Sequence, residues 1–166
     1  FTSTDGAAGL PANTTLASGT GTFSATLKTA GSQTVTATDT VTGSVTGTSG
    51  AITVGAAAAT HFAVSAPASA TAGAAFSVTV TALDAFNNTA TGYAGTVRIG
   101  SSDAQAALPA SGPLTAGVGA FSVTLRTAGA QTVTATDAAA GAVTGASGAV
   151  TVAAAAATRF TVSAAV

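Results

Sequence analysis

The sequence predicts an all-β protein in which one antiparallel β-sandwich is repeated in tandem. Residues 1–68 align with residues 99–166 at a constant offset of 98 without a gap, and 41 of the 68 aligned pairs are identical. The chain also contains 33 Thr and 20 Gly, which favour strands and turns. Over several short segments apolar residues alternate with polar ones, as in strands that bury one face. No helical period of comparable length competes with this pattern.

The repeat predicts where the domains begin and end. We place one complete copy at residues 60–157, between the matching junctions GAAAATHF and AAAAATRF. Residues 1–59 would then be the C-terminal part of a preceding copy, and residues 158–166 the first strand of a following copy. The preceding copy lacks the first strands. We therefore expect a neighbouring stretch of chain, either upstream in sequence or donated by another subunit, to complete its core.

Three strands are predicted in the first half of the complete copy. Apolar side chains recur at every second position over residues 62–66, 76–82 and 93–99. The segment APASATAG interrupts the chain after the first strand, and the turn-rich segment ALDAFNNTATG follows the second. We expect the apolar positions of all three strands to face one core.

The second half of the copy is expected to add three more strands. Residues 105–114 contain two prolines, which suit an edge strand or a loop better than a central strand. Alternation resumes over residues 121–125, 133–135 and 149–152. Six clear strands and one or two weaker ones have the spacing of a β-sandwich. The alternative, a β-solenoid, needs repeats of about 20 to 30 residues, and the period of 98 argues against it.

Two segments carry a resemblance to a known family. FSVTVTALDAFNNTATGYAGTVRI and TAGAQTVTATD resemble the bacterial immunoglobulin-like repeats that occur in tandem in invasin- and intimin-type adhesins and in other large bacterial surface proteins. The resemblance covers residues 60–157 and, through the internal repeat, the rest of the chain. It implies an immunoglobulin-like antiparallel β-sandwich of about seven strands, tandemly repeated.

The charge and the composition exclude several classes of function. Four Lys or Arg and five Asp make up 5% of the residues, and the net charge is -1. Nucleic acids and anionic membranes are bound by clustered Lys and Arg, so neither is an expected partner. The chain has no Cys, and its apolar runs are shorter than the roughly 18 residues that span a bilayer. A nearly neutral, Thr-rich surface suits contacts with copies of the same protein or a covering of sugar.

Calcium is the one candidate cofactor. In an immunoglobulin-type topology the loops after the second and sixth strands lie at the pole of the N-terminus. A preceding copy would present the loop after its third strand to that pole. Calcium takes six to eight oxygen ligands, and a shared site would stiffen the junction. The candidate ligands are Asp5, Asp84, Asn87, Asn88 and Asp137. The alternative is that these residues form turns, which Asp and Asn commonly do.

Several residues are candidates for glycosylation. Asn13 and Asn87 each begin an Asn-x-Thr sequence. A row of threonines is expected to face solvent and could carry O-linked sugar: Thr132, Thr134 and Thr136. Plain exposure to solvent is the alternative for all five side chains.

No catalytic constellation is recognisable in the sequence. The single histidine, His61, is matched by Arg159 in the repeat, so its chemistry is not preserved between the copies. Nucleophile elbows, catalytic carboxylate pairs and phosphate-binding glycine loops are absent from the sequence. We do not expect an enzyme.

We expect a structural module of an extracellular or cell-surface bacterial fibre, stalk or filament. Tandem modules would give it reach, adhesion or self-assembly, with copies of itself or adjacent repeats of the same chain as partners. Glycans are further candidate partners. The alternatives are a glycan- or protein-binding immunoglobulin-like module, and a spacer domain of a secreted enzyme.

Overall fold

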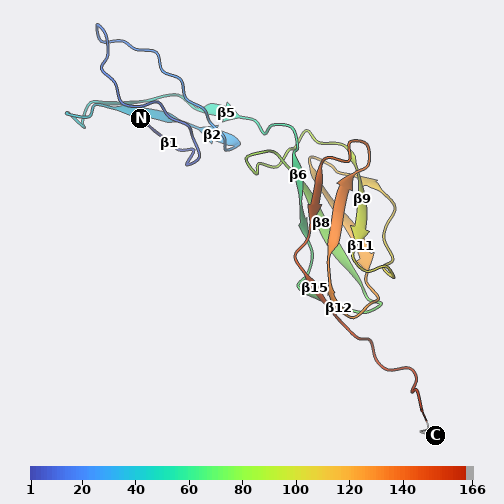
Figure 1. Ribbon diagram of the computed structural model, residues 1–166. Coiled ribbons are helices and arrows are strands. Elements are labelled where there is room, and N and C mark those ends of the chain that lie inside the picture. Colours follow the sequence, from blue (N-terminus) through green and yellow to red (C-terminus); the bar gives the residue numbers. More distant parts are fainter. Residues whose placement is uncertain (164–166) are drawn as a thin grey trace. The chain divides into compact units, whose positions relative to one another are not determined.

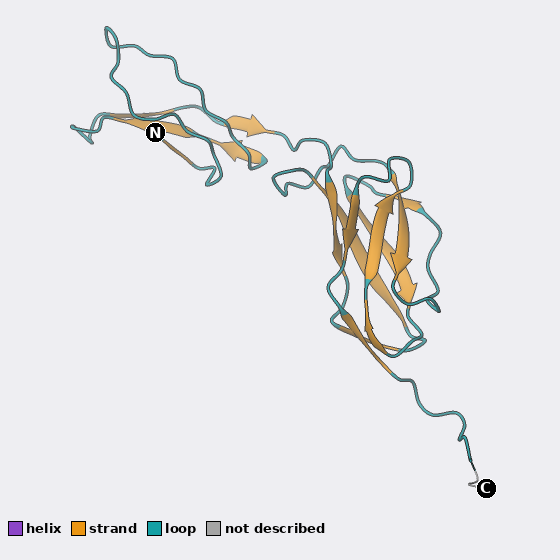
Figure 2. Ribbon diagram, viewed as in Figure 1, coloured by secondary structure: helices purple, strands orange, loops and turns teal. Residues whose placement is uncertain are grey.

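The computed structural model describes residues 1–163, which belong to two compact units. The first unit comprises Phe1–Ala57 together with Ala85–Asn88, and the second comprises Ala58–Asp84 and Thr89–Val166. Every regular element of the described residues is a β-strand (Figure 2). The prediction of an all-β fold is confirmed. Over residues 1–163 no helix is long and apolar enough to cross a membrane.

The second unit contains two main sheets and one small sheet (Figure 1). The first main sheet has the antiparallel order β11-β8-β6, with strands Val118–Thr124, Ala75–Leu83 and His61–Ser65. The second has the antiparallel order β10-β9-β13-β14, with strands Gly112–Pro113, Thr96–Ser101, Val133–Asp137 and Thr144–Ala146. The small sheet has the order β12-β15-β7, with strands Gly129–Gln131, Val150–Ala153 and Ser69–Thr71.

One hydrophobic core lies between the main sheets. Strand β8 buries Val78 and Val80 through its alternating pattern, and β11, which pairs with β8, buries Val123. From the second sheet, β9 buries Val97 and β13 buries Val133. All five side chains are fully inaccessible to solvent. The two antiparallel sheets and the core between them form a β-sandwich.

Several elements differ from the sequence prediction. The segment APASATAG was expected only to end the first strand, but it contains β7, which pairs in parallel with β15. Strand β14 was not predicted, because Thr144–Ala146 carries no large apolar side chain. The third predicted strand begins at Thr96, and Tyr93 precedes it in a loop. The one strand within residues 105–114 is the short β10. It lies at the edge of its sheet, where Pro113, which has no N–H to donate, is tolerated.

The predicted solvent-facing threonines are half-buried rather than fully exposed: Thr132 just before β13, and Thr134 and Thr136 within it. Strand β13 lies between β9 and β14, so neighbouring strands cover both its flanks. At one of these positions the Thr134 hydroxyl stands close to Gly100 of β9. The same partial burial applies to Thr132 and Thr136.

The first unit repeats the strand positions of the second at the offset of 98 residues. Its antiparallel sheet β1-β3-β4 and its two-stranded sheet β2-β5 contain strands Thr2–Ser3, Val35–Thr38, Thr46–Thr48, Gly31–Gln33 and Ile52–Val54. The registers repeat as well. Thr36 pairs with Thr48 in the first unit as Thr134 pairs with Ala146 in the second. The two copies therefore share their strand pairing as well as their sequence.

The first unit lacks a buried apolar core. Among residues 1–57 and 85–88, Asp5 and Gln33 are buried, but no hydrophobic side chain is. Leu16 is 51% exposed, whereas Leu114, its equivalent in the second unit, is 2% exposed. The prediction for residues 158–166 was a further first strand. Residues 158–163 contain no strand, and residues 164–166 lie outside the described residues.

Candidate functional site: a groove in the first unit

Both copies of the repeat contain the same aspartate-anchored loop. The Asp5 carboxylate accepts hydrogen bonds from the backbone N–H groups of Lys28 (2.5 Å), Thr29 (3.0 Å) and Ala7 (2.9 Å), and from the Thr29 hydroxyl (2.6 Å). These hydrogen bonds hold the pKa of Asp5 well below its usual value, and the bond from the Thr29 hydroxyl contributes most. Asp5 therefore ties its own loop to the segment just before β2.

Asp103 has the equivalent partners in the second unit. It accepts from the N–H groups of Arg126 (2.6 Å), Thr127 (3.0 Å) and Gln105 (2.9 Å), and from the Thr127 hydroxyl (2.7 Å). The Arg126 N–H is the largest cause of the lowered pKa of Asp103. The repeat predicted that Asp5 and Asp103 are equivalent but did not predict this role. The conserved spacing to a Thr in both copies was the available signal.

Asp39 and Asp137, the second pair of equivalent aspartates, each close a turn. Asp137 accepts from the Tyr93 hydroxyl (2.5 Å) and from the N–H groups of Ala139 (2.8 Å) and Ala140 (2.9 Å), and the Tyr93 bond contributes most to its lowered pKa. Burial, together with the Asp137 charge, raises the pKa of Tyr93. Asp39 accepts from two backbone N–H groups in the same way, and these bonds lower its pKa.

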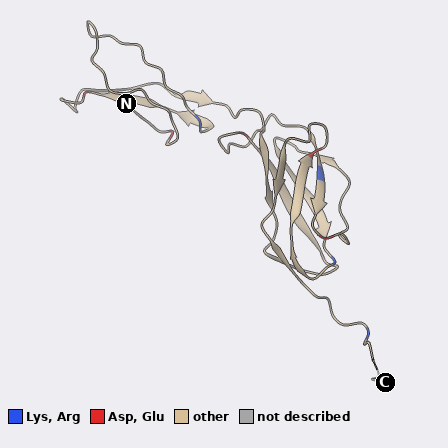
Figure 3. Cartoon of the chain, viewed as in Figure 1, with Lys and Arg blue, Asp and Glu red and all other residues tan. Residues whose placement is uncertain are grey.

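The calcium candidates are divided between the two units. Asp5, Asn87 and Asn88 belong to the first unit, and Asp84 and Asp137 belong to the second. Within residues 1–163 no three His, Cys, Asp or Glu side chains form a group that could hold a metal ion. Figure 3 shows the charged residues as isolated coloured positions along the chain. Calcium binding stays a prediction.

Asn88 is held by hydrogen bonds within the first unit, whereas Asn87 and Asn13 are exposed. The Asn88 side chain donates to the Lys28 carbonyl (2.7 Å) and accepts from the Ala30 N–H (2.8 Å). Asn87 is exposed and has a positive φ of 65°. Asn13 is exposed too. Glycosylation of Asn13, Asn87 and the half-buried row Thr132, Thr134 and Thr136 stays a prediction.

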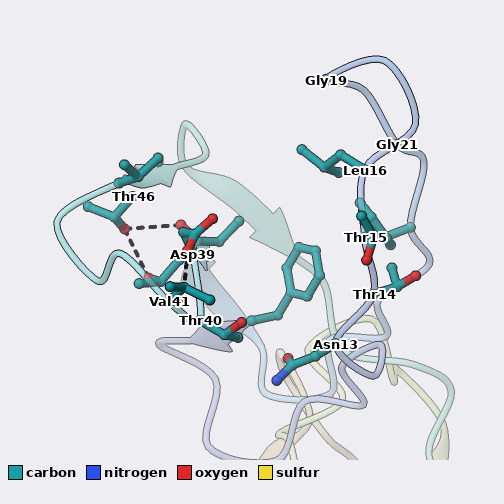
Figure 4. Close-up of a pocket in the computed structure, with 16 residues that line it drawn as sticks. Asn13, Thr14, Thr15, Leu16, Gly19, Gly21, Asp39, Thr40, Val41 and Thr46 are labelled. Atoms are coloured by element: carbon teal, nitrogen blue, oxygen red, sulfur yellow. Dashed lines mark hydrogen bonds between the residues drawn. The ribbon is translucent and has the colours of Figure 1, made fainter.

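A groove of about 910 Å³ lies in the first unit. In Figure 4 the loop that carries Asn13, Leu16 and Gly21 stands on one side, and the turn that carries Asp39 and Val41 stands on the other. The lining is mostly apolar or hydroxyl-bearing. It consists of Phe1, Asn13, Thr14, Thr15, Leu16, Gly19, Gly21, Phe23, Ala37, Thr38, Asp39, Thr40, Val41, Val45, Thr46 and Gly47.

The groove corresponds to the volume that the first strands occupy in the second unit. Ala135, the equivalent of the groove residue Ala37, is fully buried there. A Cβ built on Gly145 would collide with the carbonyl oxygen of Phe62 in β6. A Cβ on Gly47, the equivalent of Gly145, would meet no atom within 4 Å. The same inner surface is thus covered in one copy and open in the other.

The chemistry of the groove suits strand packing. Asp39 is the only ionisable side chain in its lining, and its carboxylate already accepts the N–H groups of Val41 (2.8 Å) and Thr42 (2.7 Å). Val41 and Val45 are 93% and 63% exposed. Exposed apolar side chains beside open strand edges favour association with another strand.

No protein-family model matches the sequence. No curated protein matches it significantly. Among solved structures the chain is similar to "Structure of surface layer protein SbsC, domains 1-6", with 23% identity, 81% of this chain and 18% of that chain covered, and a TM-score of 0.44. It is also similar to "Crystal structure of the S-layer protein SbsC domains 4 and 5", with 23% identity, 78% and 62% covered, and a TM-score of 0.42. In both cases the chain spans less than two thirds of the other protein's length.

Proposed function

We propose that the chain is a structural segment of an extracellular bacterial fibre, stalk or filament built from tandem immunoglobulin-like modules. The observation that carries this proposal is the repeated pairing. Strands β1 to β5 repeat, at a constant offset, the positions and registers of strands in the second unit. A module copied head to tail adds length to a chain.

Self-association follows from the open copy. The first unit has no equivalent of β6, which packs against β13 and β14 in the second unit, or of β8, which pairs with β6. An exposed half-core with free strand edges is stabilised when another stretch of chain adds strands to it. We therefore propose that the partners of this chain are copies of itself or adjacent repeats of the same protein.

An extracellular location fits the surface of the chain. With charged residues at 5%, contacts between copies meet little electrostatic repulsion. The exposed Asn13 and Asn87 are acceptors for N-linked sugar if the chain passes through a glycosylating compartment. The role proposed is mechanical and not catalytic.

Sedimentation velocity of the full chain over a concentration series tests the proposal. We expect the weight-average sedimentation coefficient to rise with concentration, and electron microscopy to show elongated assemblies. A chain that remains monomeric at every concentration would contradict self-assembly. Saturable binding to a glycan array by such a monomer would favour the binding-module alternative.

A further inference from the structure

We propose that the loop Ala85–Asn88 is a latch: it comes from the sequence of one repeat and holds the preceding repeat by binding the strip of residues 28–30. This inference rests on the proposed function and names the residues through which consecutive repeats are joined. The loop connects β8 to β9 in sequence, but it belongs to the first unit, whereas Asp84 and Thr89 on either side of it belong to the second.

The base of the loop is fixed by the second unit. Leu83 and Thr89 form an antiparallel bridge, and the Ala90 N–H donates to the Ala82 carbonyl (2.9 Å). Within the loop Asn87 has a positive φ of 65°, a conformation that Asn adopts more readily than most residues. A short loop with a fixed base and a defined turn loses little conformational freedom when it binds.

Asn88 makes the specific part of the contact. Its side-chain NH2 group donates to the Lys28 carbonyl (2.7 Å), and its side-chain oxygen accepts from the Ala30 N–H (2.8 Å). One amide side chain therefore binds a backbone acceptor and a backbone donor on either side of Thr29. Among the side chains only Asn and Gln carry an NH2 donor and a carbonyl acceptor on the same planar group.

The strip that Asn88 binds is itself held in place within the first unit. The Asp5 carboxylate accepts the N–H groups of Lys28 (2.5 Å) and Thr29 (3.0 Å), and also the Thr29 hydroxyl (2.6 Å). Asp5 thus fixes the backbone that presents the Lys28 carbonyl and the Ala30 N–H. A partner whose polar groups are fixed beforehand is bound at a lower entropic cost.

Lys28 makes a second contact with the loop. Its Nζ lies 5.7 Å from the centroid of the Phe86 ring, a distance at which an ammonium group is attracted to an aromatic ring. The Phe86 side chain is 49% exposed. Water screens this attraction in part, so we expect it to stabilise the latch less than Asn88 does.

The repeat keeps the strip that the latch binds. Residues 126–128 are Arg-Thr-Ala where residues 28–30 are Lys-Thr-Ala. Asp103 accepts the N–H groups of Arg126 and Thr127 as Asp5 accepts those of Lys28 and Thr29. The cation and the anchored backbone are thus present in both copies, as a surface used once in every repeat requires. In tandem arrays such nearest-neighbour contacts add to the stability of each module.

Hydrogen exchange at the Ala30 amide of the full chain tests the latch, because this N–H donates directly to Asn88. Asn88→Ala removes both hydrogen bonds, and we expect Ala30 to exchange about 3- to 10-fold faster. Asn87→Gly is the matched control, since the Asn87 side chain is exposed and Gly accepts the positive φ. It should leave the Ala30 rate within about twofold of that of the unchanged chain.

A double-mutant cycle tests the contact between Lys28 and Phe86. Lys28→Met and Phe86→Leu should each speed Ala30 exchange by about 2- to 5-fold. The double variant should exchange no faster than either single variant, because each substitution removes the same contact. Effects that multiply in the double variant would overturn this second contact.

The amides of β13 distinguish the latch from a general loss of stability. Val133 and Ala135 are fully buried in the second unit, so their exchange should be the same in Asn88→Ala as in the unchanged chain. An Ala30 rate that ignores Asn88→Ala, or an equal acceleration at Ala30 and in β13, would overturn the latch. So would an Ala30 rate that a calcium chelator changes, because the Asn88 oxygen would then serve a metal ion.

Sedimentation velocity of the unchanged chain keeps this outcome separate from that of the proposed function. A chain that self-associates but whose Ala30 exchange ignores Asn88→Ala loses the latch and keeps the proposed assembly. A chain that stays monomeric at every concentration while Asn88→Ala speeds Ala30 exchange keeps the latch and loses the proposed self-association.

Discussion

At the scale of single residues, the aspartates do the same structural work in both copies. Asp5 and Asp103 each accept three backbone N–H groups and one threonine hydroxyl, and these donors hold two chain segments together. Hydrogen bonds to the charged form favour ionisation, which is why both pKa values are lowered. The carboxylates are thus parts of the fold and tie its stability to pH.

We predict that Asp103→Asn lowers the melting temperature of the second unit at neutral pH. An Asn keeps only one oxygen, so in either orientation its NH2 group would face a backbone N–H: those of Arg126 and Thr127, or that of Gln105. The pKa of Asp103 is lower in the folded chain than its unfolded value of about 3.9, so its contribution is present above that pH. It is lost as the pH falls further, through the folded value.

Thermal melts over a pH series measure this effect. The difference in melting temperature between the original chain and Asp103→Asn should shrink as the pH falls below about 3.9. A difference that is the same at neutral and acidic pH would contradict the assignment.

A matched pair of glycines gives a second residue-scale prediction. Gly145→Val should destabilise the second unit by about 1–3 kcal/mol or more, because the new side chain collides with β6 and overpacks the core. Gly47→Val should change the free energy of unfolding of the chain by less than about 0.5 kcal/mol, since its Cβ meets open space. Urea unfolding of dilute samples measures both. Equal losses would show that the first unit is covered at this position.

At the scale of elements, alternation alone predicts only strands that carry large apolar side chains. Strands β8, β11 and β15 each bury two large apolar side chains two residues apart, and alternation predicted all three strands. Strands β7 and β14 consist of Ser, Ala, Thr and Gly, and their partners β15 and β13 hold them. Such strands depend on tertiary pairing, which a single segment does not encode.

The groove was also predictable only in part. The missing equivalents of Phe62 and Val78 indicated an open half-core, and the groove lies where those strands pack in the second unit. Its sides were not predictable, because Leu16 lies in an irregular loop outside any alternating segment. Leu114, the buried equivalent of Leu16, was missed for the same reason.

The first strand of the repeat gives the element-scale prediction. Phe62→Ala should cost about 3–5 kcal/mol, since the ring is 3% exposed and its loss leaves a cavity beneath β6. Phe160→Ala, at the equivalent position, should change the stability of the dilute monomer by less than about 0.5 kcal/mol, because that ring is 94% exposed. Denaturant unfolding followed by circular dichroism measures both. A large loss for Phe160→Ala in dilute solution would show that its ring is already buried within the monomer.

At the scale of the whole molecule, stability is unevenly distributed. Every hydrophobic side chain that is buried among residues 1–163 belongs to the second unit. The first unit is ordered mainly by hydrogen bonds, including the threonine pairs Thr36 with Thr48 (2.8 Å) and Thr38 with Thr46 (3.0 Å), and by one aromatic contact between Phe1 and Phe23. Net gains from such exposed bonds are small beside the conformational entropy lost on ordering. The two copies of one repeat should consequently differ in stability.

We predict that residues 60–157, expressed alone, unfold in one cooperative transition, whereas residues 1–59 alone are unfolded or aggregate. The first fragment retains the whole buried core, and the second has polar Asp5 and Gln33 as its buried side chains. Hydrogen exchange of the full chain at low concentration gives the matching readout. Amides of β3 should exchange faster than those of β13, although both strands occupy the same place in the repeat. A stable, monomeric fragment from residues 1–59 would contradict the repeat boundaries, because a closed core would then exist without the strands equivalent to β6 and β8.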